Sequence, residues 1–84
     1  MTPGECRAAR ALLGWSQDEL VRHSGVAKKT IADFERGATK RPHAVSISAI
    51  IAAFEAAGIE FIPRGVRMRS RRKLNQQEVE PDTG

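Results

Sequence analysis

The sequence contains little cysteine and few aromatic residues. Its single cysteine, Cys6, excludes an intramolecular disulfide and a zinc site built on several cysteines. Aromatic residues make up 5% of the chain, and there is no tyrosine. A glycine-rich phosphate loop is missing, as is a recognisable pair of nucleophile and base. The sequence therefore favours neither an enzyme nor a metal site, and no cofactor is expected.

Long apolar stretches are also missing. The longest, around residues 49–54, is far shorter than the roughly 20 residues that span a bilayer. The first residues lack the charged-then-apolar pattern of a signal peptide. We therefore expect a soluble, cytoplasmic chain with no membrane partner. Its 84 residues, 40% of them apolar, allow one small domain, and such domains often gain stability from a second subunit.

Charge is distributed unevenly along the chain. Residues 1–73 hold fourteen basic and seven acidic side chains, whereas residues 74–84 hold three acidic ones and no base. The whole chain carries a net charge of +4. A basic body fits a polyanionic partner, with nucleic acid considered first and an acidic membrane second. A charge that serves only solubility is the alternative.

Two capping-box patterns predict helix starts in the first third of the chain. Thr2 is followed three residues later by Glu5, and Ser16 is followed in the same way by Glu19. A glycine stands where each of these helices should end. The predicted helices are residues 3–13 and 17–24.

Two further helices follow. A third is expected from Ala27 or Lys28 to Arg36, and a fourth after a cap at Ser46, ending at Gly58. Helical spacing of apolar residues predicts the buried face of the fourth helix. These residues are Ile47, Ile50, Ile51 and Phe54.

After Gly58 the pattern becomes β-like. Residues 59–62 and 66–69 read as short extended segments around a turn at residues 63–65. From residue 70 the chain is polar and charged, and we expect it to be disordered.

The segment from Gln17 to Arg36 has the spacing of two short helices that cross at a tight turn. Gly25 falls where the turn needs a positive φ angle. Apolar residues fall where the two helices must meet. This is helix-turn-helix geometry, which presents the outer face of its second helix to the major groove of DNA. The apolar positions are Leu20, Val26, Ile31 and Phe34.

Over about residues 5–58 the chain resembles the XRE/Cro family of helix-turn-helix regulators, which includes lambdoid phage repressors. The resemblance implies a mainly α domain of four to five helices at residues 1–58, followed here by a β-like dimerisation segment at 59–69 and a disordered tail at 70–84. Ala27 departs from the family pattern because it cannot cap the third helix with its side chain. The matching residues are Trp15-Ser16-Gln17-Asp18-Glu19-Leu20, Ser24-Gly25-Val26, Thr30-Ile31-Ala32-Asp33-Phe34-Glu35-Arg36-Gly37 and Thr39-Lys40-Arg41-Pro42.

The resemblance implies base-reading side chains on the exposed face of the third helix. Lysine suits the O6 and N7 acceptors of guanine, and aspartate accepts from the cytosine amine. The alternatives are that the lysines touch only phosphate and that Asp33 restrains Lys29 one turn away. Thr30 either contacts DNA or fills space. The four residues are Lys28, Lys29, Thr30 and Asp33.

The resemblance also implies residues that position the domain on the DNA backbone. Gln17 contacts phosphate and braces the reading helix, or else is merely solvated. His43 approaches the minor groove, or is a solvated loop residue. Contacts of this class set register without reading sequence. The implied positioning residues are Ser16, Gln17, Arg36, Thr39, Lys40, Arg41 and His43.

The resemblance also implies a structural ion pair between Arg10 and Glu35. The alternative is that the two residues are independent surface charges. Cys6 is expected to be a buried apolar residue rather than a redox sensor.

One reading helix covers too few base pairs to define a site, so a two-fold dimer on two half-sites is expected. Apolar residues after Gly58 suggest the dimer interface, and an intramolecular hairpin on the fourth helix is the alternative. The interface residues are Ile59, Phe61, Val66 and Met68.

These features together favour a sequence-specific regulator of transcription, a homodimeric repressor or autoregulator on double-stranded operator DNA, associated with the nucleoid. The alternative is an antitoxin or another interaction module that binds a partner protein, such as a toxin or co-regulator, and represses its own operon. Its tail would then fold on that partner.

Overall fold

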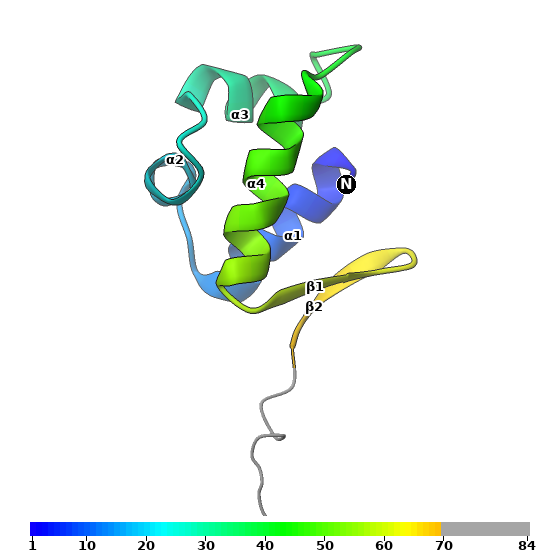
Figure 1. Ribbon diagram of the computed structural model, residues 1–84. Coiled ribbons are helices and arrows are strands. Elements are labelled where there is room, and N and C mark those ends of the chain that lie inside the picture. Colours follow the sequence, from blue (N-terminus) through cyan, green and yellow to red (C-terminus); the bar gives the residue numbers. More distant parts are fainter. Residues whose placement is uncertain (70–84) are drawn as a thin grey trace, which may run out of the picture.

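A computed structural model of the chain describes residues 1–69. Over this range four helices are followed by a two-stranded antiparallel hairpin (Figure 1). The expected mainly α fold is confirmed. The tail predicted at residues 70–84 lies outside the described residues. The elements are α1 (Pro3–Leu13), α2 (Gln17–Ser24), α3 (Lys28–Glu35), α4 (Ala44–Ala56), β1 (Ile59–Ile62) and β2 (Gly65–Met68).

Both predicted capping boxes are present, so α1 and α2 begin where the sequence indicates. Thr2 Oγ1 accepts from the Glu5 backbone N–H at 3.1 Å, and the Thr2 N–H donates to Glu5 Oε1 at 2.9 Å. Ser16 and Glu19 make the same two contacts at 3.1 and 2.9 Å. Each box satisfies donors that the first turn of a helix leaves without an intrahelical partner. Local sequence alone therefore fixes these two helix starts.

α3 begins at Lys28 without a side-chain cap, as the alanine before it predicts. It ends at Glu35, one residue earlier than expected, and Gly37 adopts a positive φ of 71° just beyond it. Neither acidic residues in its first turn nor basic residues in its last turn stabilise this helix. Its position therefore depends on contacts with the rest of the domain.

The prediction that Ser46 caps α4 is wrong. The helix begins two residues earlier, at Ala44, and the His43 carbonyl accepts from the Ile47 N–H at 3.1 Å. Neither Ala44 nor Val45 prevents a helix from starting before the serine. Serine is favoured at an N-cap, but the preference is worth only about 1 kcal/mol, and here it does not decide the boundary.

The core lies between the helices and extends into the hairpin. β2 packs against α1, and β1 packs against α4. Ile59, the first residue of β1, is fully buried with the apolar residues of the helices. The largest fully buried side chains are Phe54, Leu20, Ile31, Ile50, Ile59 and Cys6.

The hairpin corrects part of the predicted dimer interface. β1 and β2 pair with each other within one chain, so that Ile59 lies opposite Met68 and Phe61 lies opposite Val66. Because Ile59 is 0% exposed, it belongs to the core of its own chain and cannot lie on an interface with a second copy. Phe61 and Val66 are partly buried against that core, and Met68 is 44% exposed.

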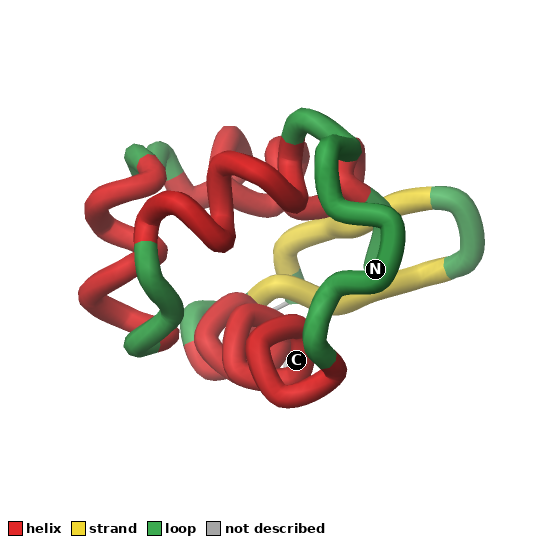
Figure 2. Tube along the Cα trace, turned by 90° about the horizontal axis from the view of Figure 1, so that it is seen from above, coloured by secondary structure: helices red, strands yellow, loops and turns green. Residues whose placement is uncertain are grey.

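The hairpin and α3 lie at opposite ends of α4. Figure 1 shows α3 and the loop that follows it beside the start of α4, whereas the hairpin follows the end of that helix. Seen from above, the tip of the hairpin extends beyond the helices on one side (Figure 2). The domain thus presents two separate surfaces, one around α3 and one along the hairpin.

Candidate nucleic-acid interface

α2 and α3 form a helix-turn-helix unit whose inner faces are buried. Both helices contact the rest of the domain, α2 through α4 and α3 through α1, and they contact each other. Gly25 ends α2 with a φ of 75°, the left-handed conformation that the tight turn requires. The four apolar positions predicted at the crossing are all buried. They are Leu20, Val26, Ile31 and Phe34.

The opposite face of α3 is open to solvent. Lys28 and Lys29 are exposed, whereas Thr30 and Asp33 are half-buried. Lys29 and Asp33 lie one turn apart on this face, Lys28 lies at its edge beside α2, and Thr30 lines a pocket with Asp33 on the side of α4. No contact with DNA is present, so their reading role stays a prediction.

Acidic side chains accompany the cations on this face. Lys28 Nζ lies 3.0 Å from Asp18 Oδ1 of α2, and Lys29 Nζ lies 2.9 Å from Asp33 Oδ2. Arg36 forms a second ion pair with Asp33. Hydrogen bonds from Lys29 and Arg36 hold the pKa of Asp33 below its usual value. Asp33 therefore restrains Lys29, as the alternative interpretation suggested, and its carboxylate stays charged near neutral pH.

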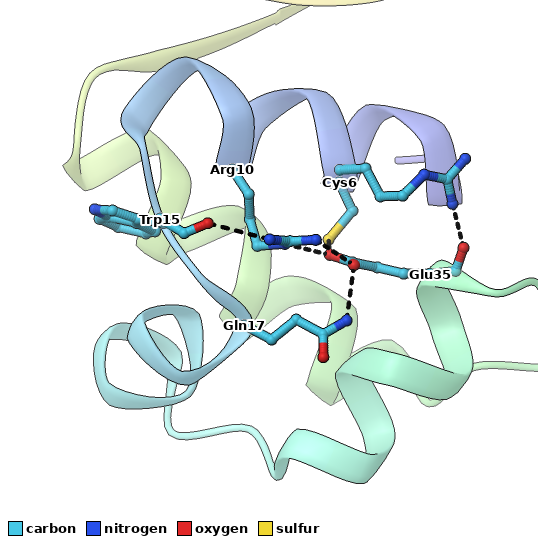
Figure 3. Close-up of polar contacts among 6 residues, drawn as sticks. Cys6, Arg10, Trp15, Gln17 and Glu35 are labelled. Atoms are coloured by element: carbon cyan, nitrogen blue, oxygen red, sulfur yellow. Dashed lines mark hydrogen bonds and ion pairs between the residues drawn. The ribbon is translucent and has the colours of Figure 1, made fainter.

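A buried polar cluster joins the end of α3 to α1 and to the start of α2 (Figure 3). Glu35 is 4% exposed and receives hydrogen bonds from both preceding helices. Arg10 donates from Nη2 to Oε1 at 2.7 Å and from Nε to Oε2 at 2.8 Å. Gln17 Nε2 donates to Oε1 at 3.0 Å, and Cys6 Sγ donates to Oε2 at 3.0 Å. We call Cys6, Arg10, Gln17 and Glu35 the Glu35 cluster.

The ionisation of the Glu35 cluster follows from these contacts. Burial opposes the charged form of Glu35, but hydrogen bonds from Arg10, Cys6 and Gln17 outweigh it, so its pKa lies below the usual value. The Arg10 pKa is raised, chiefly by its hydrogen bond to Glu35. Burial, with the hydrogen bond to Glu35 and its charge, raises the pKa of the Cys6 thiol. The cluster is thus an ionised carboxylate and guanidinium with a neutral thiol at physiological pH.

A helix-turn-helix family model matches residues 7–59 of the chain. The chain belongs to the XRE family of helix-turn-helix DNA-binding proteins. Membership of this family indicates a DNA-binding regulator of transcription. Proteins of this family are generally not enzymes. No curated protein matches the sequence. The family and the exposed face of α3 together identify the candidate interface with DNA.

In this XRE domain the loop after α3 carries most of the predicted positioning residues. Arg36, Thr39, Lys40 and Arg41 are all exposed, as are His43 and Ser16. Lys40 and Arg41 form no ion pair with an acid of residues 1–69. Between the loop, α3 and the start of α4 lies a pocket of about 140 Å³ whose lining includes Thr30, Thr39 and His43.

Gln17 has both a structural and a predicted DNA role. Its amide donates to Glu35, which supports the expectation that it braces the reading helix. The amide group has two donors, and the bond to Glu35 uses one of them. The second is compatible with a phosphate contact, which stays a prediction.

Three contacts of the domain were missed by sequence reasoning. Cys6 is more than an apolar residue, because its thiol donates to Glu35. Arg7 donates to the backbone carbonyl of Glu35, at the end of α3. Asp18 pairs with Lys28 across the turn. Cys6 and Arg10 are four residues apart on one helix, and this spacing was the available signal.

Two further properties of residues 1–69 bear on function. In this range no helix combines the length and apolar character that crossing a bilayer requires. The same residues hold no group of three or more histidine, cysteine or acidic side chains arranged to bind a metal ion.

Proposed function

We propose that the protein is a homodimeric repressor or autoregulator that binds a two-fold symmetric operator through the major groove. The observation that carries the proposal is the division of α3 into two faces. Ile31, Phe34 and Glu35 fix the helix in the scaffold, whereas Lys28 and Lys29 extend from it into solvent. A helix held in this way presents its cations to a groove without reorganising the domain.

Base reading follows from the chemistry of the exposed side chains. A lysine ammonium donates to the O6 and N7 atoms of guanine, and the Asp33 carboxylate accepts from the N4 amine of cytosine. Thr30, beside them on α3, adds a methyl or hydroxyl contact. We therefore expect each half-site to contain at least one G·C pair at a defining position.

Backbone contacts follow from the loop cations that have no acidic partner within residues 1–69. Lys40 and Arg41 suit phosphates that flank the half-site, and Arg36 and Thr39 lie along the same loop. Ser16 and Gln17 meet the backbone at the start of α2, and His43 approaches the adjacent minor groove. These contacts supply affinity and register, and they make binding sensitive to salt.

Dimerisation supplies the second half-site, about 34–36 Å away or a multiple of that distance. The hairpin offers its free strand edges and the exposed Met68, with Phe61 and Val66 beside it. Truncation after Gly58 would remove the core residue Ile59, so Met68→Glu is the cleaner test of this interface. Sedimentation should show a dimer for the wild type and a shift toward monomer for the variant. A wild type that stays monomeric on operator DNA overturns the dimer.

Repression would be steric, since a bound dimer excludes RNA polymerase from a promoter, and the site of action would be the nucleoid. The alternative of an antitoxin or interaction module depends on residues 70–84, which the structure does not describe. No contact among residues 1–69 favours it specifically.

Selection of bound DNA from a random pool, followed by footprinting, tests the function directly. We expect an enriched site with dyad symmetry and protection of two half-sites. The Lys28→Ala/Lys29→Ala variant is the matched control, because both side chains are exposed and their loss leaves the core intact. It should enrich no sequence. If the wild-type protein enriched no sequence from the random pool, sequence-specific binding would be contradicted.

A further inference from the structure

Asp18 joins the two helices of the DNA-binding unit by a contact that the family assignment does not require. It is the second residue of α2, and its Oδ1 lies 3.0 Å from Nζ of Lys28, the first residue of α3. The two side chains are 67% and 60% exposed. A pair this exposed contributes little to stability, so its significance lies in the charge that it places beside the reading face.

The surroundings of Lys28 make this carboxylate distinctive. The first turn of α3 carries two lysines and no acid, and it has no side-chain cap. The partial positive charge of the helix N-terminus adds to that of the lysines. Asp18 offsets the charge of Lys28, just as Asp33 offsets the charge of Lys29.

Two cations of the loop after α3 show the opposite arrangement. Lys40 and Arg41, which suit phosphate contacts, have no acidic partner within residues 1–69. Lys28 and Lys29, which are suited to base edges, are therefore paired with acids, as is Arg36 at the end of α3, whereas Lys40 and Arg41 are not. The acids thus lie beside the reading helix, and the two cations further along the loop keep their full charge for phosphate.

We propose that Asp18 is a specificity-determining residue that lowers the affinity of Lys28 for phosphate while leaving it free to read guanine. The proposal rests on the proposed function. A phosphate that approaches Lys28 also approaches the Asp18 carboxylate, and the two negative charges repel each other. The ammonium has three donors, so it keeps one bond to Asp18 and directs the other two to guanine O6 and N7.

The test compares binding of wild type and Asp18→Asn to the selected operator and to an unrelated duplex of equal length. We expect affinity for the unrelated duplex to rise by up to about fivefold, the range of an exposed ion pair. Affinity for the operator should rise less, so discrimination falls. For unrelated DNA, the slope of the logarithm of the binding constant against the logarithm of the salt concentration should steepen by up to roughly 0.9, the value for one added phosphate contact.

Glu55→Gln is the matched control for net charge. Glu55 is exposed near the end of α4, removed from α3, and forms no ion pair with residues 1–69. Its loss should change binding to both duplexes by the same factor. Thermal melting monitored by circular dichroism establishes that both variants are folded.

A second variant tests whether Asp18 acts through Lys28. In a Lys28→Ala background, Asp18→Asn should have no effect beyond that of Glu55→Gln. The inference is overturned if Asp18→Asn changes both duplexes equally, or if its effect survives the loss of Lys28. In either case a wild type that still prefers its operator leaves the proposed function standing. A wild type that binds both duplexes equally overturns the proposed function itself.

Discussion

Both polar regions of α3 pair a carboxylate with a cation, but they differ in burial. At its end, Glu35 meets Arg10 with a side chain that is 3% exposed. On its outer face, Lys28 meets Asp18 with side chains that are 60% and 67% exposed. The first region fixes where the helix lies, and the second leaves its charges within reach of another molecule.

Physical chemistry explains why the two regions should respond differently to mutation. In an exposed pair, water solvates both charges and screens their attraction, so loss of either partner costs little. In a buried pair, the charge that remains after loss of its partner has neither water nor a counter-ion. Substitutions in the buried region should therefore lower stability, whereas those in the exposed region should mainly change binding.

Arg10→Ala should destabilise the domain most. It leaves the buried Glu35 carboxylate without its charged partner and removes the bond from Arg10 Nη1 to the Trp15 carbonyl at 3.1 Å. We expect a loss of about 3–5 kcal/mol in the free energy of unfolding, measured by urea titration.

Arg22→Ala is the control for that measurement. Arg22 is 66% exposed and lies 3.8 Å from Glu19, so its loss should change stability by less than about 0.5 kcal/mol. If the two arginine substitutions lowered the free energy of unfolding equally, the Glu35 cluster would not be what holds α3 in place.

The response to acid should report the same cluster. The Glu35 pKa is lower in the folded chain than in the unfolded one, so its contribution to stability is present above about pH 4.3. That contribution is lost as the pH falls through the lower, folded value. Urea midpoints between pH 7 and pH 3 should therefore fall more steeply for wild type than for Glu35→Gln.

A matched control is again available in the exposed Glu55. Glu55→Gln removes a carboxylate that makes no ion pair with residues 1–69, so this variant should keep the steep acid limb of the wild type. Parallel curves for wild type and Glu35→Gln would mean that Glu35 does not titrate as its hydrogen bonds require.

Substitution of Cys6, also in the buried region, should lower stability less than substitution of Arg10. The side chain is 0% exposed, and burial raises the pKa of its thiol, so both access and thiolate formation are suppressed. An aromatic disulfide reagent should leave the folded protein unmodified and react in urea. Cys6→Ala should cost about 1–2 kcal/mol through the lost donor and volume. Rapid reaction in the native state would instead favour the redox sensor.

The same comparison shows what the sequence predicts well. The two capping boxes and the turn at Gly25 depend on residues a few positions apart, and the structure confirms them. Helical spacing likewise identified the buried residues at the crossing of α2 and α3. Local patterns of this kind carry their own physical cause, so they need no knowledge of the tertiary fold.

What the sequence misses depends on contacts between distant segments. The Cys6 thiol meets Glu35 across 29 positions, and its spacing from Arg10 places the two on one helix face without identifying Glu35 as their shared partner. The location of Ile59 was misjudged for the same reason, whereas the start of α4 was misjudged because a local capping preference did not decide the boundary. An apolar residue after a helix can cover its own core or a second subunit, and only the fold decides between them.

Asp33→Asn is expected to have the smallest effect on stability and so gives the sharpest contrast with Arg10→Ala. The carboxylate is on the surface of α3, where it holds Lys29 and Arg36. The Tm should stay within about 2 °C of wild type, because both cations paired with Asp33 are largely exposed and ion pairs that water reaches contribute little to folding. Binding should change selectively, because an amide both donates and accepts, so preference for cytosine at one position of each half-site should weaken. Loss of affinity by the same factor on every sequence would assign Asp33 to the restraint of Lys29 alone. A large fall in Tm would place Asp33 with Glu35, among the residues that position α3 rather than those that contact DNA.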